Sequence, residues 1–213
     1  MQHYLDMLFY ILKGLGIIIE LYAVTAIFSI PLSILFALGK ISKISLLKKS
    51  IGIYTWAFRG TPLLLQLFFV YYGLPYFGIK LSPFVAASIT FILNYSAYLT
   101  EIVRAGIESI DKGQYEAAKV LGMGYWKTMI RIILPQTLKR VLPPFSNEAI
   151  TLVKDSALIS VIGLSEILRN SKEIVTREFS VMPFVIAAII YLVITSLIVV
   201  VFKKLEKKYS YYN

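Results

Sequence analysis

Apolar residues gather into five long runs along the chain, and polar or charged stretches separate them. The runs cover residues 15–38, 61–77, 83–105, 141–158 and 182–202, and the second is irregular, because the apolar residues 51–56 lead into Arg59-Gly60-Thr61-Pro62 ahead of it. Each approaches the roughly 20 residues that an α-helix needs to cross the hydrocarbon layer of a bilayer. The pattern predicts an all-α integral membrane protein with five transmembrane helices, in which residues 1–213 form a single transmembrane domain.

The composition supports this prediction and excludes other classes of protein. Hydrophobic residues make up 58% of the 213 residues and charged residues only 16%, whereas soluble domains hold roughly 25% charged residues. The net charge of +10 comes from clusters of Lys and Arg that flank the apolar runs. This placement is typical of membrane-protein loops and argues against nucleic acid as a partner. Without cysteine there are no disulfides or thiolate metal sites, and the one histidine, His3, cannot form a metal site alone.

The Lys and Arg residues are distributed unequally between the two sides of the predicted membrane domain. Of the 22, fifteen lie in residues 40–49, residues 104–140 and the C-terminal tail. Positive charge accumulates in cytoplasmic loops, so the sequence predicts a multi-pass protein of the cytoplasmic membrane with its N-terminus outside and its C-terminus in the cytoplasm. The amphipathic residues 162–179 are expected to lie along the outer surface. The aromatic residues within 68–77 are expected to form an interfacial belt on that side.

Residues 112–134 form a polar, helix-prone loop between two apolar runs. The residues predict two short helices, at 114–121 and 125–133. Gly122 lies between them and can take the left-handed conformation that ends a helix. Such a loop either contacts a soluble partner or lies on the lipid headgroups, and the residues alone favour the two interpretations equally.

Several motifs bring a known family into consideration. The spacing Glu116-Ala117-Ala118, Gly122 and Ile132-x-Leu134-Pro135 resembles the signature loop of the permease subunits of binding-protein-dependent ABC importers. The stretches 59–66, 98–106 and 154–158 resemble the polar amino-acid branch, the histidine, glutamine and arginine permeases. The resemblance implies a type I importer permease fold, in which this loop is a cytoplasmic coupling helix that docks onto a separate ATPase. The coupling residues it implies are Gln114, Glu116, Ala117, Ala118 and Gly122.

The resemblance also implies partners and an energy source. We expect a second permease subunit, identical or a close paralogue, two ATPase subunits, an extracellular substrate-binding protein and an amino-acid substrate. The chain lacks the phosphate-loop pattern, because Gly39-Lys40 is followed by Ile41 and has no glycine upstream at the required spacing. ATP and Mg²⁺ are therefore expected on the partner ATPase, with no cofactor and no enzymatic activity on this chain. An ion-coupled secondary carrier is the alternative function.

Candidate substrate ligands lie in the fourth run. Ionisable groups inside a membrane cost roughly 2.5–3.5 kcal/mol each on insertion scales, so Glu148, Lys154 and Asp155 need a reason to be there. Glu148, Thr151 and Asp155 share one helical stripe by their spacing, and two carboxylates favour a basic amino acid. Alternatively, Asp155 pairs with Lys154 or with a neighbouring helix. Pro143-Pro144 are expected to bend or open the helix ahead of the stripe.

Three further polar positions lie in or beside the earlier runs. Asn94 is expected either to hydrogen-bond between helices or to contact the substrate. Glu101 and Arg104, three residues apart, are expected to form a structural ion pair. Arg59 either neutralises a substrate carboxylate or anchors its helix at the interface.

Overall fold

The computed structural model describes residues 2–209, and within them every regular element is helical. This confirms the predicted all-α class. In chain order the elements are α1 (Gln2–Leu12), α2 (Leu15–Ile41), α3 (Ser45–Gly60), α4 (Leu63–Phe68), the π-helix η1 (Phe69–Gly73), the 3₁₀-helix η2 (Leu74–Phe77), α5 (Pro83–Glu108), α6 (Lys112–Val120), α7 (Tyr125–Thr128), the π-helix η3 (Met129–Ile133), α8 (Leu134–Asp155), the 3₁₀-helix η4 (Ser156–Ile162), α9 (Ile167–Glu178) and α10 (Met182–Tyr209).

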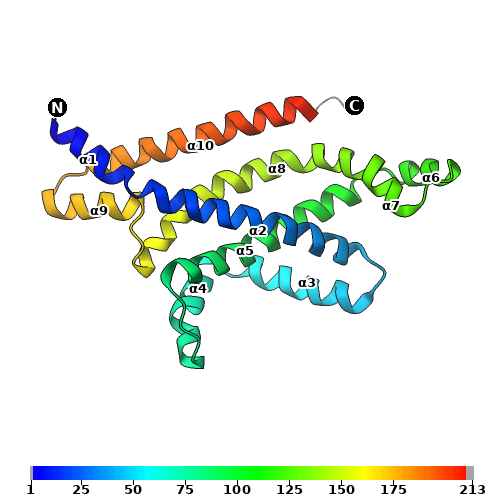
Figure 1. Cartoon of the computed structure of the whole chain (residues 1–213), viewed down its shortest axis with the longest axis horizontal. Coiled ribbons are helices and arrows are strands. Elements are labelled where there is room, and N and C mark those ends of the chain that lie inside the picture. The colour runs from blue at the N-terminus through cyan, green and yellow to red at the C-terminus, as the bar shows by residue number, and fades with distance from the viewer. Residues whose placement is uncertain (1, 210–213) are drawn as a thin grey trace.

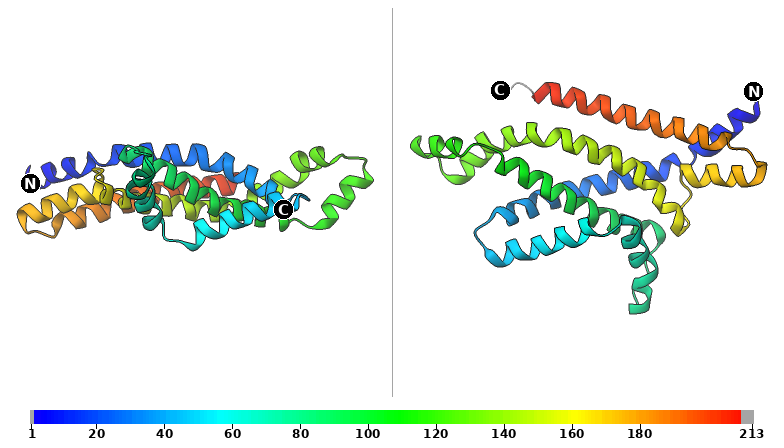
Figure 2. Two further views of the ribbon diagram at one scale, coloured as in Figure 1. Left: turned by 90° about the horizontal axis from the view of Figure 1, so that it is seen from below. Right: turned by 180° about the vertical axis from the view of Figure 1, so that it is seen from behind.

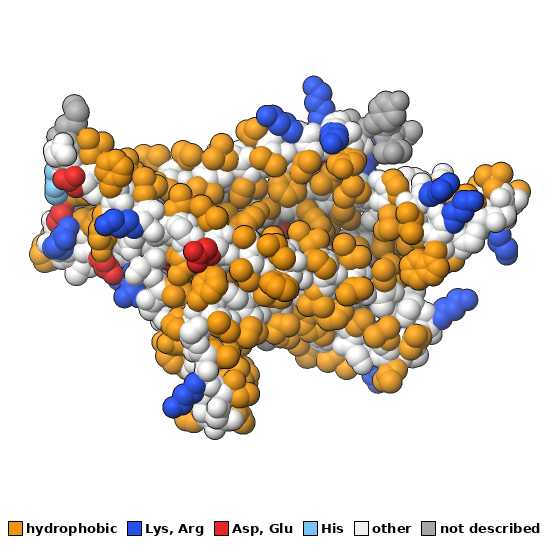
Figure 3. Space-filling model, in the orientation of Figure 1, with side chains coloured by type: hydrophobic (Ala, Val, Ile, Leu, Met, Phe, Trp, Pro, Cys, Tyr) orange, Lys and Arg blue, Asp and Glu red, His pale blue; other side chains and the backbone are white. Residues whose placement is uncertain are grey.

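The long helices α2, α5, α8 and α10 run along the length of the molecule, and α3 runs beside α2 (Figures 1 and 2). Residues 112–134, called the coupling loop from here on, contain α6 and α7 and extend from one end of the molecule (Figure 1). Helices α1 and α9 lie at the other end (Figure 1). The segment of α4, η1 and η2 leaves the bundle sideways (Figure 1). Apolar side chains cover most of the middle of one face, while Lys and Arg gather toward the ends and at the tip of the side segment (Figure 3). This distribution suits a bundle that crosses a membrane along its length.

The helices follow the predicted runs, and the second run is irregular, as the sequence predicts. The segments Gln2–Ile41 and Met182–Tyr209 are long and apolar enough to span a membrane, and Leu63–Phe77 is a shorter apolar helix. The run 61–77 is not one regular α-helix, since it changes from α-helix to π-helix and then 3₁₀-helix before Gly78, where φ is +80°. Helix α3, which precedes this run, was not predicted as a separate helix from the sequence. Where each helix enters the membrane stays a prediction.

Small side chains allow α2 and α5 to pack closely. Thr25, Ser29, Ser33 and Ala37 recur every fourth residue on α2, and all four are buried. Helix α5 buries small residues as well, including Ala87 and Ser96. Small residues at helix contacts let backbones approach, which is how membrane helices associate without a hydrophobic driving force between them.

The α8 helix continues through Pro143 and Pro144, both of which lie inside it. Of the two predicted effects of these prolines, opening of the helix is wrong, and a bend stays a prediction. The fixed φ of proline is close to the helical value, although the ring removes a backbone donor. Helix α8 also packs against both α5 and α10, so the neighbouring helices hold it in one continuous piece.

Helix α9 is fixed to its surroundings by carboxylates. The buried Glu166 caps its first turn by accepting two backbone N–H groups at 2.6 Å, and Tyr191 of α10 donates to the same carboxylate at 3.0 Å. Glu173 accepts a hydrogen bond from Tyr10 of α1 at 2.7 Å and one from Arg169 at 3.2 Å. The Tyr10 hydrogen bond, followed by that from Arg169, lowers the pKa of Glu173. These contacts join α1, α9 and α10 at the end of the molecule opposite the coupling loop.

Candidate functional site

The coupling loop has the helix–turn–helix form that the sequence predicts. Asp111 caps α6, since its carboxylate accepts from the Gly113 backbone N–H at 2.6 Å. Gly122 has a φ of +71°, the left-handed conformation that favours glycine at the end of a helix. The second predicted helix is α7, continued as the π-helix η3 to Ile133.

Apolar side chains at the tip of the coupling loop are exposed to solvent. The exposed fraction is 87% for Val120, 77% for Leu121 and 66% for Trp126. Gln114, Glu116 and Ala117 are also exposed, whereas Ala118 is buried. An exposed apolar patch with a polar rim marks a surface that contacts a protein or a membrane. Val120 and Leu121 were not predicted from the sequence as contact residues. Their position, two apolar residues directly before a helix-ending glycine in a charged loop, could have indicated this role.

The base of the coupling loop is firmly attached to the bundle. Met129 and Ile133 of η3 are buried in one cluster with Ala37 of α2 and with Val103 and Ile107 of α5. Because η3 leads directly into α8, a force applied to the coupling loop would act on α2, α5 and α8 together. Packed interiors of this kind transmit displacement and do not absorb it.

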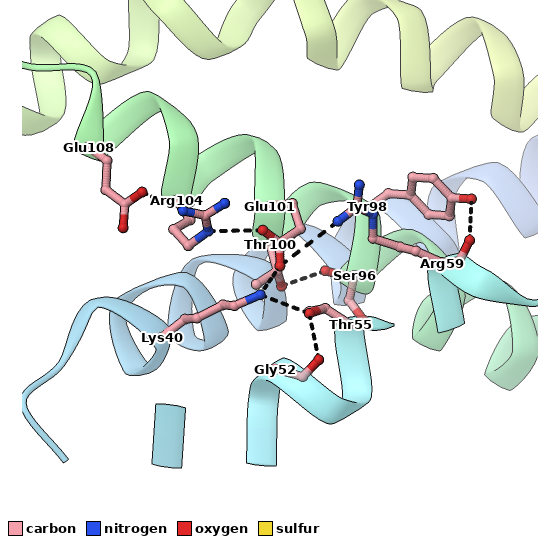
Figure 4. A network of polar contacts seen from close by, with 10 residues as sticks. All are labelled: Lys40, Gly52, Thr55, Arg59, Ser96, Tyr98, Thr100, Glu101, Arg104 and Glu108. Carbon is pink, nitrogen blue, oxygen red and sulfur yellow. Dashed lines mark hydrogen bonds and ion pairs between the residues drawn. The ribbon is translucent and has the colours of Figure 1, made fainter. Parts of the chain in front are cut away.

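A cluster of polar side chains around Glu101 joins α2, α3 and α5 (Figure 4). The predicted ion pair is confirmed, with 2.9 Å between Arg104 Nε and Glu101 Oε2. Lys40 of α2 pairs with the other carboxylate oxygen and also donates to Thr55 Oγ1 at 2.9 Å. From α3, Arg59 places Nη1 4.0 Å from Glu101 Oε1. This role of Lys40 was not predicted from the sequence, although a lysine at the end of an apolar run could have indicated it.

Asn94 hydrogen-bonds between helices in this structure. Its Nδ2 donates to the Phe58 carbonyl at 3.1 Å and to Gln66 Oε1 at 3.0 Å. The Gln66 amide in turn donates to Thr61 Oγ1 at 2.8 Å. The network connects α5 to the junction of α3 and α4. It matches the first of the two roles expected for Asn94, and substrate contact stays a prediction.

Two residues of the predicted stripe on α8, and the neighbouring Lys154, lie in different surroundings. Asp155 accepts a hydrogen bond from the Tyr95 hydroxyl of α5 at 2.8 Å. Thr151 donates to the Asn147 carbonyl of its own helix at 2.9 Å. Lys154 is exposed, and the described residues show no ion pair between it and Asp155. Of the two structural alternatives for Asp155, contact with a neighbouring helix is the one observed.

Glu148 lies on the wall of an open hollow between α3, α5 and α8. The hollow has a volume of about 760 Å³, within the roughly 300–1,000 Å³ typical of small-molecule sites. Its lining is mostly polar and charged, and the charged side chains among it are Arg59, Glu101, Arg104, Arg140 and Glu148. The structure thus brings Glu148 together with the Glu101 cluster, which the sequence did not predict. Asp155 and Asn94 are not among the lining residues.

Comparison with known proteins gives a consistent result over nearly the whole chain. Residues 29–211 match the family described as binding-protein-dependent transport system inner membrane component. The chain is 41% identical over 204 residues to the probable amino-acid ABC transporter permease protein YckA of Bacillus subtilis (strain 168), covering 95% of this chain and 90% of YckA. It is 42% identical over 201 residues to the arginine transport system permease protein ArtQ of the same strain, covering 93% of this chain and 92% of ArtQ.

A solved structure shows the same arrangement of helices. The structure described as an amino acid ABC transporter with histidines contains a chain that matches with a TM-score of 0.86 and 36% identity. The match covers 93% of this chain and 94% of that one. The bundle, the side segment and the coupling loop therefore belong to one shared fold.

Proposed function

The chain belongs to the binding-protein-dependent transport system inner membrane components and has the type I ABC importer permease fold, and from this premise we propose that it is the permease subunit of an ATP-driven importer of amino acids. The observation that carries the proposal is the end-to-end similarity to YckA and ArtQ. An ion-coupled carrier, the alternative left by the sequence, has no support among these relatives.

The energy for transport is proposed to come from a separate ATPase that binds the coupling loop. The exposed Val120 and Leu121 beside Glu116 and Ala117 offer a mixed apolar and polar surface for such a partner. We propose a complex of two permease subunits, two ATPases that bind ATP and Mg²⁺, and an external binding protein. Closure of the ATPases would move the coupling loops together, and the buried base of each loop would pass that motion to α5 and α8. The proposed orientation places the coupling loop and the C-terminus in the cytoplasm and the N-terminus outside.

The proposed substrate is a polar amino acid, with a preference for basic ones. Support comes from the arginine system to which ArtQ belongs and from the carboxylates Glu148 and Asp155 on α8. Glu148 faces an open hollow of suitable size. Thr151, Lys154 and Asn94 complete the proposed substrate-binding set, and they would contact the amino acid in a state that opens the path beside α5 and α8.

The test is reconstitution of the chain with its ATPase in liposomes, with the binding protein supplied outside. Uptake is measured for arginine, histidine, glutamine and glutamate. We expect ATP-dependent uptake that is fastest for a basic amino acid, is unaffected by dissipating ion gradients, and falls in Glu148→Gln and Asp155→Asn variants. Uptake that follows an ion gradient without ATP would reject the importer. A clear preference for glutamate would reject the basic substrate class alone.

A further inference from the structure

The charged groups around the hollow differ in how completely they are paired. Glu101 is bonded to both Lys40 and Arg104. Arg59 is the exception among the cations beside it, because its Nη1 lies 4.0 Å from Glu101, outside hydrogen-bonding range. On the opposite wall, Glu148 makes no hydrogen bond or ion pair with any residue in the described range 2–209. The hollow therefore holds a cation whose one ion pair, with Glu101, is long at 4.0 Å, and a carboxylate without a direct partner among the described residues, contributed by different helices.

Tyr98 contacts Arg59 at both its backbone and its guanidinium, while much of the side chain remains exposed. Its guanidinium carbon lies 5.5 Å from the centre of the Tyr98 ring, within the range of a cation–π contact. The Tyr98 hydroxyl also donates to the Arg59 carbonyl at 3.4 Å. The Arg59 side chain is 44% exposed, against 18% for Lys40. Figure 4 shows Arg59 lying beside Tyr98, with its guanidinium directed toward the Glu101 cluster.

A third bond to Glu101 does not account for this arrangement. The Glu101 carboxylate already accepts from Lys40 on one oxygen and from Arg104 on the other. A further cation inside a membrane protein is costly without an anion of its own. Arg59 makes only the 4.0 Å ion pair with Glu101, so its guanidinium N–H groups remain available to hydrogen-bond a second anion.

We propose that Arg59 binds the α-carboxylate of the transported amino acid and that Glu148 faces the cationic group of the same molecule across the hollow, an inference that rests on the proposed function. A guanidinium presents two parallel N–H groups that match the two oxygens of a carboxylate. Every α-amino acid carries that carboxylate, so Arg59 recognises the class of substrate. The groups facing the side chain then decide which member of the class is carried.

The experiment measures equilibrium binding to the complex of permease and ATPase in lipid nanodiscs, without the binding protein, so that only the membrane site is sampled. The probes are L-arginine and L-glutamine, each compared with its α-carboxamide, L-argininamide or L-glutaminamide. The variants are Arg59→Gln and Arg59→Lys. Arg140→Gln is the control, because Arg140 lines the same hollow but donates to the Ser109 carbonyl. Size-exclusion chromatography checks that every variant assembles.

We expect Arg59→Gln to weaken binding of the amino acid about tenfold to a hundredfold, the range for a lost hydrogen bond to a charged group. Binding of the carboxamide should not change, so the preference for the free carboxylate disappears. Arg59→Lys should lose less, and Arg140→Gln should behave as the wild type.

Equal weakening of amino acid and carboxamide, loss of assembly in Arg59→Gln, or no change in either would overturn the inference, since each indicates a structural role or none for Arg59. Failure of the proposed function looks different, because the wild-type complex would then bind and transport neither amino acid.

Discussion

The coupling loop and the hollow present opposite kinds of surface. At the hollow, the lining residue Glu101 is bonded to Arg104 of its own helix and, behind the wall, to Lys40 of α2. At the tip of the coupling loop, Val120 and Leu121 are apolar and almost fully exposed. The first arrangement stabilises the chain by itself, whereas the second leaves contact surface for another protein.

The difference separates two consequences of mutation. A change in the bonded cluster should lower the stability of the chain, because it leaves charges without partners inside the bundle. A change at the loop tip should leave the chain intact and weaken only its association with the ATPase. Arg59 and Glu148 stand out in the hollow because neither has a hydrogen-bonded partner there, which is why they are assigned to a ligand.

The largest effect on stability is expected from Glu101→Leu. Removing one member of a buried ion pair costs about 3–5 kcal/mol; we expect less, about 2 kcal/mol, because Glu101 and its partners are only partly buried and Arg104 retains Glu108 as a partner. The measurement is the midpoint of thermal unfolding in lipid nanodiscs, which should fall clearly. Glu108→Leu is the matched control: its side chain is 52% exposed, and exposed pairs contribute about 0–1 kcal/mol. If both variants unfold at the same temperature, the cluster does not stabilise the bundle.

A comparable effect, of a different kind, is expected from Leu121→Asp. Leu121 is 77% exposed, so the unfolding midpoint should hardly move. A charge placed in the centre of a protein contact should weaken ATPase association by about 2 kcal/mol, or roughly 30-fold. Co-purification and surface plasmon resonance with the ATPase measure this directly.

Leu46→Asp is the control for that substitution, since Leu46 is also 77% exposed but belongs to α3 and not to the coupling loop. Unchanged ATPase association should follow. Equal weakening by the two substitutions would show that exposure alone, and not position in the coupling loop, determines the effect.

The two regions also differ in how far the sequence could predict them. The coupling loop is a contiguous segment, so its two helices and the left-handed Gly122 followed from local propensities and spacing. The Glu101–Arg104 pair followed for the same reason, because three residues on a helix bring side chains together. Each of these features depends on residues that are close in the chain.

The hollow could not be predicted in the same way, because it depends on contacts between distant residues. Arg59 and Glu148 lie on α3 and α8, and α3 was not predicted as a separate helix. In residues 45–60, Lys48, Lys49 and Arg59 interrupt the apolar positions, so the segment is less apolar than the longer runs. The continuity of α8 through Pro143 and Pro144 also depends on its neighbours, since the packing of α5 and α10 overrides the local signal of two prolines.

The smallest effect is expected from Gly122→Ala, which tests whether ATPase association depends on the backbone conformation of the turn or only on the side chains at the loop tip. Gly122 has a φ of +71° and Gly124 a φ of −70°, and a Cβ at either position would meet no atom within 4 Å. Alanine at 122 therefore brings backbone strain alone, about 1 kcal/mol, while alanine at 124 brings none. We expect Gly122→Ala to weaken ATPase association about fivefold and Gly124→Ala to leave it unchanged. An equal response from the two variants would mean that the ATPase recognises the side chains of the loop tip and tolerates changes in the turn, so that the exposed Val120 and Leu121 alone would account for docking.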